Sequence, residues 1–348
     1  MSLTNYSTFR NFGFAEVVWH SEMKINSDLF CISLDFCNFA INDGEITPFR
    51  QKKKLLSLFC AQLFVTLQAK CDDSEMPAYD IRPLQLRILN ILQAVDETCR
   101  KHQLRYFIWA GTMIGAVRHQ GFIPWDDDLD IAMPRPDYDR LIAHCGEWLP
   151  EPFEMVCAEN DPVYPLPFAK IQDGSTTLIE RMHLKYLGGI YLDVFPIDGA
   201  PEGWLAQKWH FGRYEYYKRV LYLLFRDPYK HGHGPSSWVP LLCRKLYSLA
   251  EVQGKIRRLL TKYNYEDCRL VADYDDGSKG VMPKTVLGTP VPFTFEGIQA
   301  LGVEQYDTYL SHKYGDYMTI PDGNHQRQHN FHYLDLDHSY KHYQSEQA

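Results

Sequence analysis

Residues 105–133 read RYFIWAGTMIGAVRHQGFIPWDDDLDIAM and hold the most informative pattern in the chain. The apolar run at residues 106–110 predicts a buried strand that Gly111 ends. Thr112 is a typical capping residue and predicts a short helix that reaches about Arg118. A strand that leads into such a helix start leaves backbone N–H groups pointing outward, so this unit is suited to binding an anion.

Four carboxylates follow within five positions, in the run WDDDLD at residues 125–130. Side chains of an extended segment alternate between two faces, so Asp126, Asp128 and Asp130 are expected on one face and Asp127 on the other. An acidic run taken alone is often only a solvated turn. Buried beside a strand, the same cluster needs a divalent cation to offset its charge, and oxygen ligands favour Mg²⁺ or Mn²⁺.

Three further segments predict the rest of a sheet. Residues 128–133 alternate between acidic and apolar side chains, which predicts a second strand. The segment PLPFAKIQDGSTTLIER at residues 165–181 predicts two short strands around a turn at residues 173–174. The segment GGIYLDVFPIDGAP at residues 188–201 predicts another strand, from which Asp193 projects as a lone carboxylate among apolar residues.

Helical patterns surround these strands. In residues 84–104, apolar side chains recur at helical spacing and predict a strongly amphipathic helix. Residues 204–225 and 238–263 predict two more helices, of which the second carries its basic side chains on the polar side. We expect these helices to support the sheet rather than to carry the chemistry.

Composition excludes several classes of protein. The 348 residues include 44 acidic and 36 basic side chains, and the net charge of −8 argues against non-specific nucleic-acid binding. The nine cysteines form no CxxC pair, which argues against a disulfide framework or a thiolate zinc site and favours a reducing cytoplasm. The histidine pairs His231/His233 and His329/His332 lack zinc-type spacing. Aromatic residues make up 14% of the chain and are compatible with pockets for sugars, bases or quaternary cations.

The segment at residues 107–141, FIWAGTMIGAVRHQGFIPWDDDLDIAMPRPDYDRL, resembles the signature of the LicD family. This family includes bacterial phosphocholine transferases and is related to fukutin-type phosphosugar transferases. The similarity extends from the helix near residue 82, through GGIYLDVFPID, to YLSHKYGDYMTIP at residues 309–321, which is roughly three quarters of the chain. The resemblance implies an α+β fold of the nucleotidyltransferase, polymerase beta-like type, with a mixed sheet and surrounding helices.

The resemblance also implies an enzyme and its reaction. This is metal-dependent transfer of phosphocholine from CDP-choline to a hydroxyl of a cell-surface glycan or its precursor, such as lipopolysaccharide or teichoic acid, with release of CMP. One alternative keeps the chemistry but moves ribitol phosphate or glycerol phosphate from a CDP donor. Two others are a glycosyltransferase that uses Mn²⁺ and a sugar nucleotide, and a non-catalytic glycan-binding protein.

The family's functional residues match seven positions of this chain, and Asp126 lies in the same acidic run. The resemblance assigns Asp128, Asp130 and Asp193 to catalysis and, together with Asp126, to binding Mg²⁺ or Mn²⁺. The family's glycine turn and the basic position after it, which contact the donor's phosphates, match Gly111, Thr112, Gly115 and Arg118.

Four more residues and one segment are candidates on their own chemistry. Lys170, in a predicted strand, either contacts a phosphate or is an exposed strand lysine. A quaternary ammonium group must be held by ring faces or carboxylates, and Trp125, Tyr191 and Phe195 are the nearest rings in sequence. Tyr191 and Phe195 lie two residues before and after Asp193, so they are expected on the same face of the strand as that carboxylate. The segment at residues 314–318 either contacts substrate or ends a helix packed on the core.

Three parts are expected along the chain. Residues 1–75 are an N-terminal extension of unknown role, residues 76–321 are a LicD-like catalytic domain with helical elaborations, and residues 322–348 are a polar, His-rich tail. In the extension, the apolar run Leu55–Ala69 has 15 residues, short of the roughly 20 needed to cross a bilayer. It predicts a buried or membrane-surface helix, so peripheral contact with the inner face of the membrane is compatible with a cytoplasmic protein.

Overall fold

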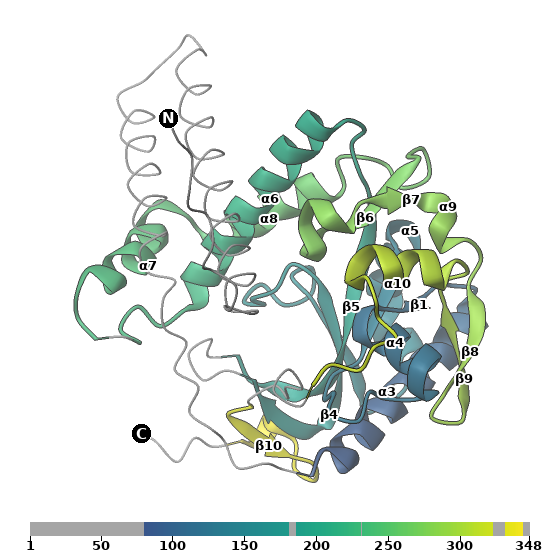
Figure 1. Cartoon of the computed structure of the whole chain (residues 1–348). Helices are drawn as coiled ribbons and strands as arrows, with labels where there is room; N and C mark the ends of the chain where they lie inside the picture. The colour runs from purple at the N-terminus through teal and green to yellow at the C-terminus, as the bar shows by residue number, and fades with distance from the viewer. Residues whose placement is uncertain (1–79, 181–185, 231, 323–330, 344–348) are drawn as a thin grey trace, which may run out of the picture. The chain divides into compact units, whose positions relative to one another are not determined.

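The computed structural model describes residues 80–180, 186–230, 232–322 and 331–343 (Figure 1). All of them belong to the second of two compact units, Ser74–Ala348. The predicted extension at residues 1–75, its apolar run Leu55–Ala69, and the parts of the tail at residues 323–330 and 344–348 lie outside the described residues.

A mixed sheet forms the centre of this unit. Its main path is β1 (Phe107–Ile108), β2 (Asp130–Pro134), β5 (Gly188–Gly199), β4 (Ala169–Ile179) and β10 (Tyr333–Asp335). Only the β2–β5 pair on this path is parallel, and the other pairs are antiparallel. Three more strands, β3 (Phe153–Val156), β6 (Leu270–Asp273) and β7 (Met282–Pro283), pair with β4, β5 and β6 respectively.

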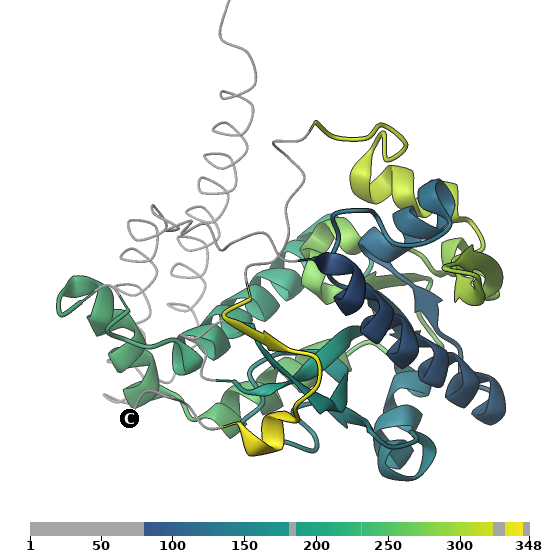
Figure 2. The ribbon, with the colours of Figure 1, turned by 90° about the horizontal axis from the view of Figure 1, so that it is seen from below.

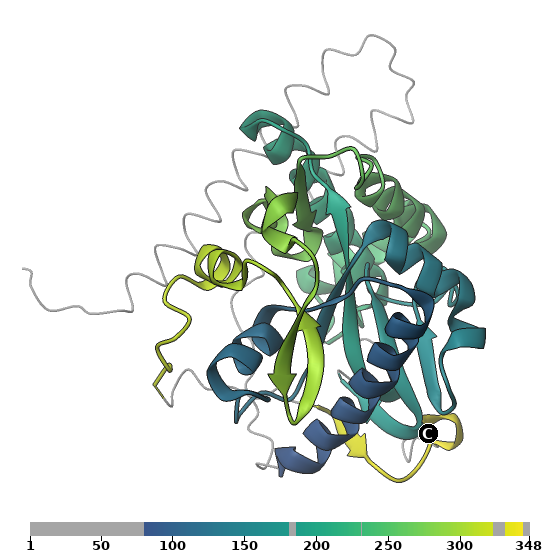
Figure 3. The ribbon, with the colours of Figure 1, turned by 90° about the vertical axis from the view of Figure 1, so that its right-hand side faces the viewer.

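Helices surround the sheet, as expected for an α+β protein. They are α3 (Ile81–His102), α4 (Ala110–His119), α5 (Arg135–Trp148), α6 (Trp204–Phe225), α7 (Pro235–Leu246), α8 (Leu249–Leu260), α9 (Lys284–Leu287) and α10 (Tyr306–Tyr314). In Figure 2 the group of α6, α7 and α8 lies at one end of the described unit, and α3, α4 and α10 lie at the other. A separate hairpin, β8 (Val291–Phe295) and β9 (Ile298–Gly302), packs between α3 and α4 (Figure 3). In the part of the chain that is described, no helix has the length and hydropathy that crossing a bilayer requires.

Two apolar cores hold the unit together. The main core joins the sheet to α3, whose Leu84, Ile88 and Leu92 are at most 1% exposed and follow the predicted helical spacing. The second core lies between α6 and α8 and includes Phe211 and Ile256. Burying one such side chain fully contributes about 1.5–3 kcal/mol, so these two faces dominate the stability of the fold.

Two predictions of secondary structure are wrong. Residues 165–181 do not form two short strands, because β4 runs on as one strand with a bulge between Asp173 and Leu178. The turn-forming side chain of Asp173 accepts hydrogen bonds from Ser175 within that bulge. Residues 238–263 form two helices rather than one, because Tyr247 is extended and Ser248 caps α8 by accepting a hydrogen bond from the Glu251 N–H.

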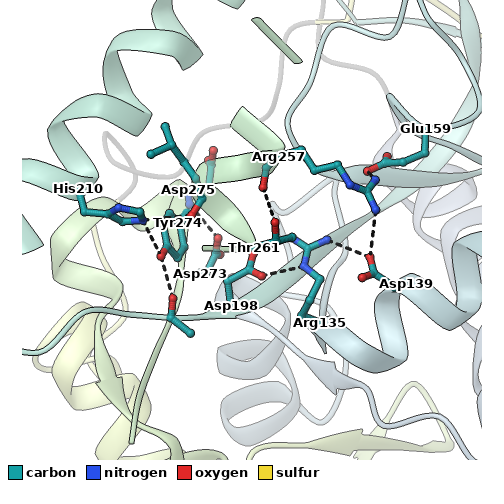
Figure 4. A network of polar contacts seen from close by, with 12 residues as sticks. Arg135, Asp139, Glu159, Asp198, His210, Arg257, Thr261, Asp273, Tyr274 and Asp275 are labelled. Atoms are coloured by element: carbon teal, nitrogen blue, oxygen red, sulfur yellow. Dashed lines mark hydrogen bonds and ion pairs between the residues drawn. The ribbon is translucent and has the colours of Figure 1, made fainter. Parts of the chain in front are cut away.

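The unit also contains a buried ion pair at the far end of β5, shown in Figure 4. Arg135, the first residue of α5, donates from Nε and from its terminal nitrogen to the two carboxylate oxygens of Asp198, at 2.7 and 2.6 Å. Arg257 of α8 contacts Glu159 and lies 3.9 Å from the Asp139 carboxylate, which also pairs with Arg135. These charges link α5, β5 and α8.

Candidate active site

The site is built on the one parallel pair of the main sheet path, β2 and β5. Asp130, the first residue of β2, is the register partner of Asp193 in β5. Partners in neighbouring strands project from the same face, so the two carboxylates lie side by side. The Asp193 N–H donates to the Leu129 carbonyl at 3.0 Å, and Leu129 and Val194 are fully buried on the core side.

The first turn of α4 adjoins these carboxylates. A Cβ at Gly111 would lie 3.0 Å from Oδ2 of Asp126, so the glycine allows this carboxylate to approach the helix start. The Thr112 hydroxyl accepts a hydrogen bond from the Asp130 N–H at 2.8 Å. Thr112 is therefore not the helix cap that the sequence predicted, since it lies inside α4 and fastens the helix to β2.

The electrostatics show how closely the acidic residues gather. Burial raises the pKa of the Asp130 carboxyl well above its usual range, and the charges of Asp128, Asp193 and Asp126 raise it further. Burial also raises the pKa of the Asp193 carboxyl, although Lys170 opposes this. The four predicted carboxylates thus form one cluster around Asp130. Among the described residues, no set of three or more His, Cys, Asp or Glu side chains has the geometry of a preformed metal site.

Lys170 faces this cluster from β4. It is the register partner of Asp193 and is only 4% exposed, so it is not an exposed strand lysine. Its Nζ lies 3.4 Å from Oδ1 of Asp193 and 3.2 Å from Oε2 of Glu180. The same ammonium group lies 3.1 Å from the centroid of the Tyr191 ring. One strand thus brings a buried cation to the carboxylates.

A second cation comes from α10. Tyr309 stacks on the Trp109 ring at 4.3 Å and accepts a hydrogen bond from the Ala110 N–H, which fixes α10 against the start of α4. One helical turn later, Lys313 places Nζ 2.6 Å from Oδ2 of Asp276. The charge of Lys313 also lowers the pKa of the Asp130 carboxyl, which burial and the neighbouring carboxylates raise.

The neighbourhood of Lys313 adds further polar groups. Asp273 is buried, and burial together with Asp276 and Asp275 raises the pKa of its carboxyl. The pKa of the Tyr314 hydroxyl rises through burial first, and then through the charges of Asp276 and Asp130. No local pattern in the sequence indicated Asp273, Asp276 or Lys313. The only signal was that residues 314–318 belong to the distal segment of the resemblance.

Comparison with known proteins identifies the domain that carries this site. Residues 103–222 match the LicD/FKTN/FKRP nucleotidyltransferase domain family, and they include β2, β4, β5 and all four carboxylates. Residues 103–222 thus resemble a LicD-family domain. The resemblance seen in the sequence is thereby confirmed for these residues.

Individual relatives extend this result. The chain is 29% identical over 262 residues to the lipopolysaccharide cholinephosphotransferase LicD of Haemophilus influenzae, which covers 73% of this chain and 97% of the relative. Uncharacterised proteins of Rickettsia typhi and Rickettsia prowazekii are 39% identical over 75 and 79 residues. Those matches cover 21% and 22% of this chain, and 23% and 28% of the relatives.

Within the LicD-family domain, two residues expected at the donor's phosphates have other contacts. Arg118 lies in the last turn of α4, at the end opposite Gly111, and donates to the Tyr317 carbonyl at 2.9 Å. Gly115 is required by packing, because a Cβ there would lie 2.4 Å from the Gly121 carbonyl oxygen. The structure therefore brings Gly111 and Thr112 to the carboxylates but leaves Arg118 apart from them.

The three aromatic candidates differ in their surroundings. The Tyr191 ring already has the Lys170 ammonium group over its face, where a choline ammonium would otherwise bind. Phe195 is buried and its ring lies 4.4 Å from that of Phe168. Trp125 is partly buried and meets His119 edge to face at 6.5 Å. Choline recognition by these rings stays a prediction.

Proposed function

We propose that this protein transfers phosphocholine from CDP-choline to a hydroxyl of a cell-surface glycan or its precursor, with release of CMP. The observation that carries the proposal is the pairing of Asp130 with Asp193 on adjacent parallel strands, with Asp126 and Asp128 beside them. This arrangement suits a polymerase beta-like nucleotidyltransferase fold, which orients two reacting oxygens along a line through phosphorus. Similarity to the lipopolysaccharide cholinephosphotransferase supports the choice of donor and acceptor.

The carboxylate cluster fits Mg²⁺ or Mn²⁺. Asp130 is surrounded by three other carboxylates, and the buried Oδ1 of Asp193 has the Lys170 ammonium group 3.4 Å away. This concentration of negative charge would be offset by a divalent cation held by Asp126, Asp128, Asp130 and Asp193. When bound, such a cation lowers the pKa of a hydroxyl and neutralises charge on a leaving phosphate.

The chain's own residues supply the remaining parts of the reaction. Backbone N–H groups at the first turn of α4, near Gly111, would bind the donor's diphosphate. Asp193, whose raised pKa suits a proton acceptor, takes the proton of the attacking hydroxyl. The new bond forms between that oxygen and the phosphorus next to choline, and the bond from this phosphorus to CMP breaks. Lys170 and Lys313 limit the build-up of negative charge.

One observation favours a second donor class. Because the Lys170 ammonium group covers the Tyr191 face, the ring is less accessible to a quaternary ammonium group. A polyol phosphate such as ribitol phosphate or glycerol phosphate needs hydrogen bonds instead, and the Glu180 carboxylate and the Lys170 ammonium group line the same cavity.

A donor screen tests the proposal. Purified protein is incubated with Mg²⁺, a mixed pool of glycan acceptors, and CDP-choline, CDP-ribitol or CDP-glycerol, and CMP is measured. Release of CMP with CDP-choline, and none from the Asp130→Asn variant, is the expected result. Turnover with a polyol donor alone would show that the protein transfers a polyol phosphate rather than phosphocholine. Release of a nucleoside diphosphate from a sugar nucleotide would indicate a glycosyltransferase. No turnover with any donor, and no stabilisation by donor or metal, would leave the glycan-binding alternative.

A further inference from the structure

The outer face of α7 exposes large apolar side chains. Trp238 is 60% exposed and Leu241, one turn further on, is 39% exposed. Tyr229, in the loop before α7, is 44% exposed. The opposite face of α7 buries Val239 and Cys243, so the helix is fully packed on one side while Trp238 and Leu241 project from the other.

The position of α7 is well fixed. Its main packing partner is α6, and Arg244 donates from Nε to the Leu224 carbonyl at 3.2 Å and from a terminal nitrogen to the Arg226 carbonyl at 2.9 Å. These bonds satisfy carbonyls at the C-terminal end of α6, where a cation is also favoured by the helix dipole. Figures 1 and 2 place α7 at the edge of the described unit, beyond this end of α6.

The sequence around this face is rich in basic residues. No Asp or Glu occurs from residue 228 to residue 248, whereas Lys230, Arg244 and Lys245 do. Residues 204–262, which span α6 to α8, contain 12 Lys and Arg against 3 Asp and Glu, although the whole chain has a net charge of −8. Lys245 is exposed and follows Leu241 by one helical turn, so it borders the apolar face.

We propose that the outer face of α7, formed by Trp238, Leu241 and Lys245, docks this protein on an anionic lipid bilayer. Tryptophan, with an apolar ring system and one N–H donor, is suited to the boundary between headgroups and acyl chains. Flanking lysine and arginine are attracted to anionic headgroups, and few apolar side chains make the binding reversible. A protein partner of ordinary composition would not account for the absence of acidic side chains over this stretch. The proposal is independent of the donor and of the reaction.

Vesicle binding by the full chain tests this inference. Protein is mixed with vesicles of phosphatidylcholine alone, or of phosphatidylcholine and phosphatidylglycerol in equal parts, and the bound fraction is measured by flotation. We expect stronger binding to the anionic vesicles that weakens as salt rises. The Trp238→Ser variant should bind about tenfold more weakly, and Lys245→Gln about fivefold more weakly.

Trp204→Ser is the matched control. Trp204 is 67% exposed and Trp238 is 60% exposed, but Trp204 is the first residue of α6 and lies about 33 Å from the C-terminal end of that helix, where Arg244 of α7 binds. This variant should bind vesicles as the wild type does, and circular dichroism should show the same fold for both tryptophan variants. The proposal would be overturned if the wild type did not bind vesicles, or if Trp204→Ser and Trp238→Ser lost binding equally. It would also be overturned if the protein were a dimer that Trp238→Ser dissociates without changing vesicle binding.

Discussion

At the scale of single residues, the cluster around Asp130 concentrates negative charge in a partly buried place. Replacing Asp128 or Asp130 by Asn keeps the side-chain volume and removes one charge that a divalent cation would need. We expect each variant to lose more than about tenfold in turnover at saturating Mg²⁺, equivalent to at least about 1.4 kcal/mol in the barrier. Steady-state CMP release measures this, and retention of more than about a tenth of wild-type turnover would contradict the metal assignment.

The same cluster has a consequence for stability. Because burial and three neighbouring carboxylates raise the pKa of the Asp130 carboxyl, its charged form destabilises the folded state at neutral pH. Asp130→Asn should therefore raise the thermal midpoint of the protein in EDTA, while it abolishes the stabilisation that Mg²⁺ gives to the wild type. A lower midpoint of the variant in EDTA would show that repulsion among these carboxylates does not destabilise the folded protein. Differential scanning calorimetry with and without Mg²⁺ distinguishes the two outcomes.

Lys313 allows a different residue-scale prediction. Its ammonium group lies between Asp276 and the carboxylates around Asp130, where it can also attract the donor's diphosphate. Lys313→Met should raise the KM for the CDP donor about tenfold or more, since it removes a charge that is only 17% exposed. Lys279→Met, which removes an exposed lysine nearby, is the control and should leave KM unchanged. An equal effect of both variants would assign the change to general surface charge.

At the scale of helices and strands, the Arg135–Asp198 pair holds α5 to β5. Its guanidinium and carboxylate are 10% and 1% exposed, so removing one partner leaves the other charge buried. Arg135→Met should lower the free energy of unfolding by about 3–5 kcal/mol in urea titrations. Arg140→Met on the same helix removes a 51%-exposed guanidinium, 3.8 Å from Asp137, and should cost less than about 1 kcal/mol. Similar losses in the two variants would mean that burial of the pair is unimportant.

A pH-dependent contact joins α6 to α8 (Figure 4). Nε2 of His210 lies 3.1 Å from both the Leu259 carbonyl and the Tyr274 hydroxyl, and burial lowers the pKa of the His210 imidazole to about 4. The neutral ring is thus favoured in the folded state. The contribution of this preference to the free energy of unfolding is fully present above the unfolded pKa of about 6.5. It is lost as pH falls from there through the folded pKa of about 4.

Replacement of this histidine gives the test. The free energy of unfolding of wild type and His210→Gln is measured between pH 7 and pH 4, the interval in which the unfolded state binds a proton before the folded state does. We expect the wild type to lose more stability than the variant over this interval. Parallel curves for the two proteins would show that His210 does not titrate on unfolding.

At the scale of the whole molecule, both apolar cores are formed by described residues between Leu84 and Phe331. The first helix, α3, has its own N-cap, since the Asp80 carboxylate accepts a hydrogen bond from the Arg82 N–H at 3.1 Å. A chain that begins at Met76 should therefore fold and bind the CDP donor as the full chain does. Calorimetric titration with donor and Mg²⁺ measures this, and a folded but non-binding protein would show that residues 1–75 contribute to the site.

Several features followed from the sequence because they depend on near neighbours. Helical spacing of apolar residues placed α3, and the apolar segment around Asp193 placed β5. The acidic run at residues 126–130 indicated where charge would gather, and the resemblance to LicD proteins agrees with the family model that matches residues 103–222. Each of these signals lies within a few residues of the structure it predicts, so local propensity and side-chain alternation suffice to find it.

Only the tertiary structure decided how these pieces meet. Parallel pairing of β2 with β5 puts Asp130 beside Asp193, β4 buries Lys170 against them, and α10 delivers Lys313 from far along the chain. Likewise, β10 pairs with β4 although its sequence gave no strand signal. Strand neighbours, register and burial are set by how apolar surfaces far apart in the sequence pack together. The few residues around any one position therefore cannot predict them.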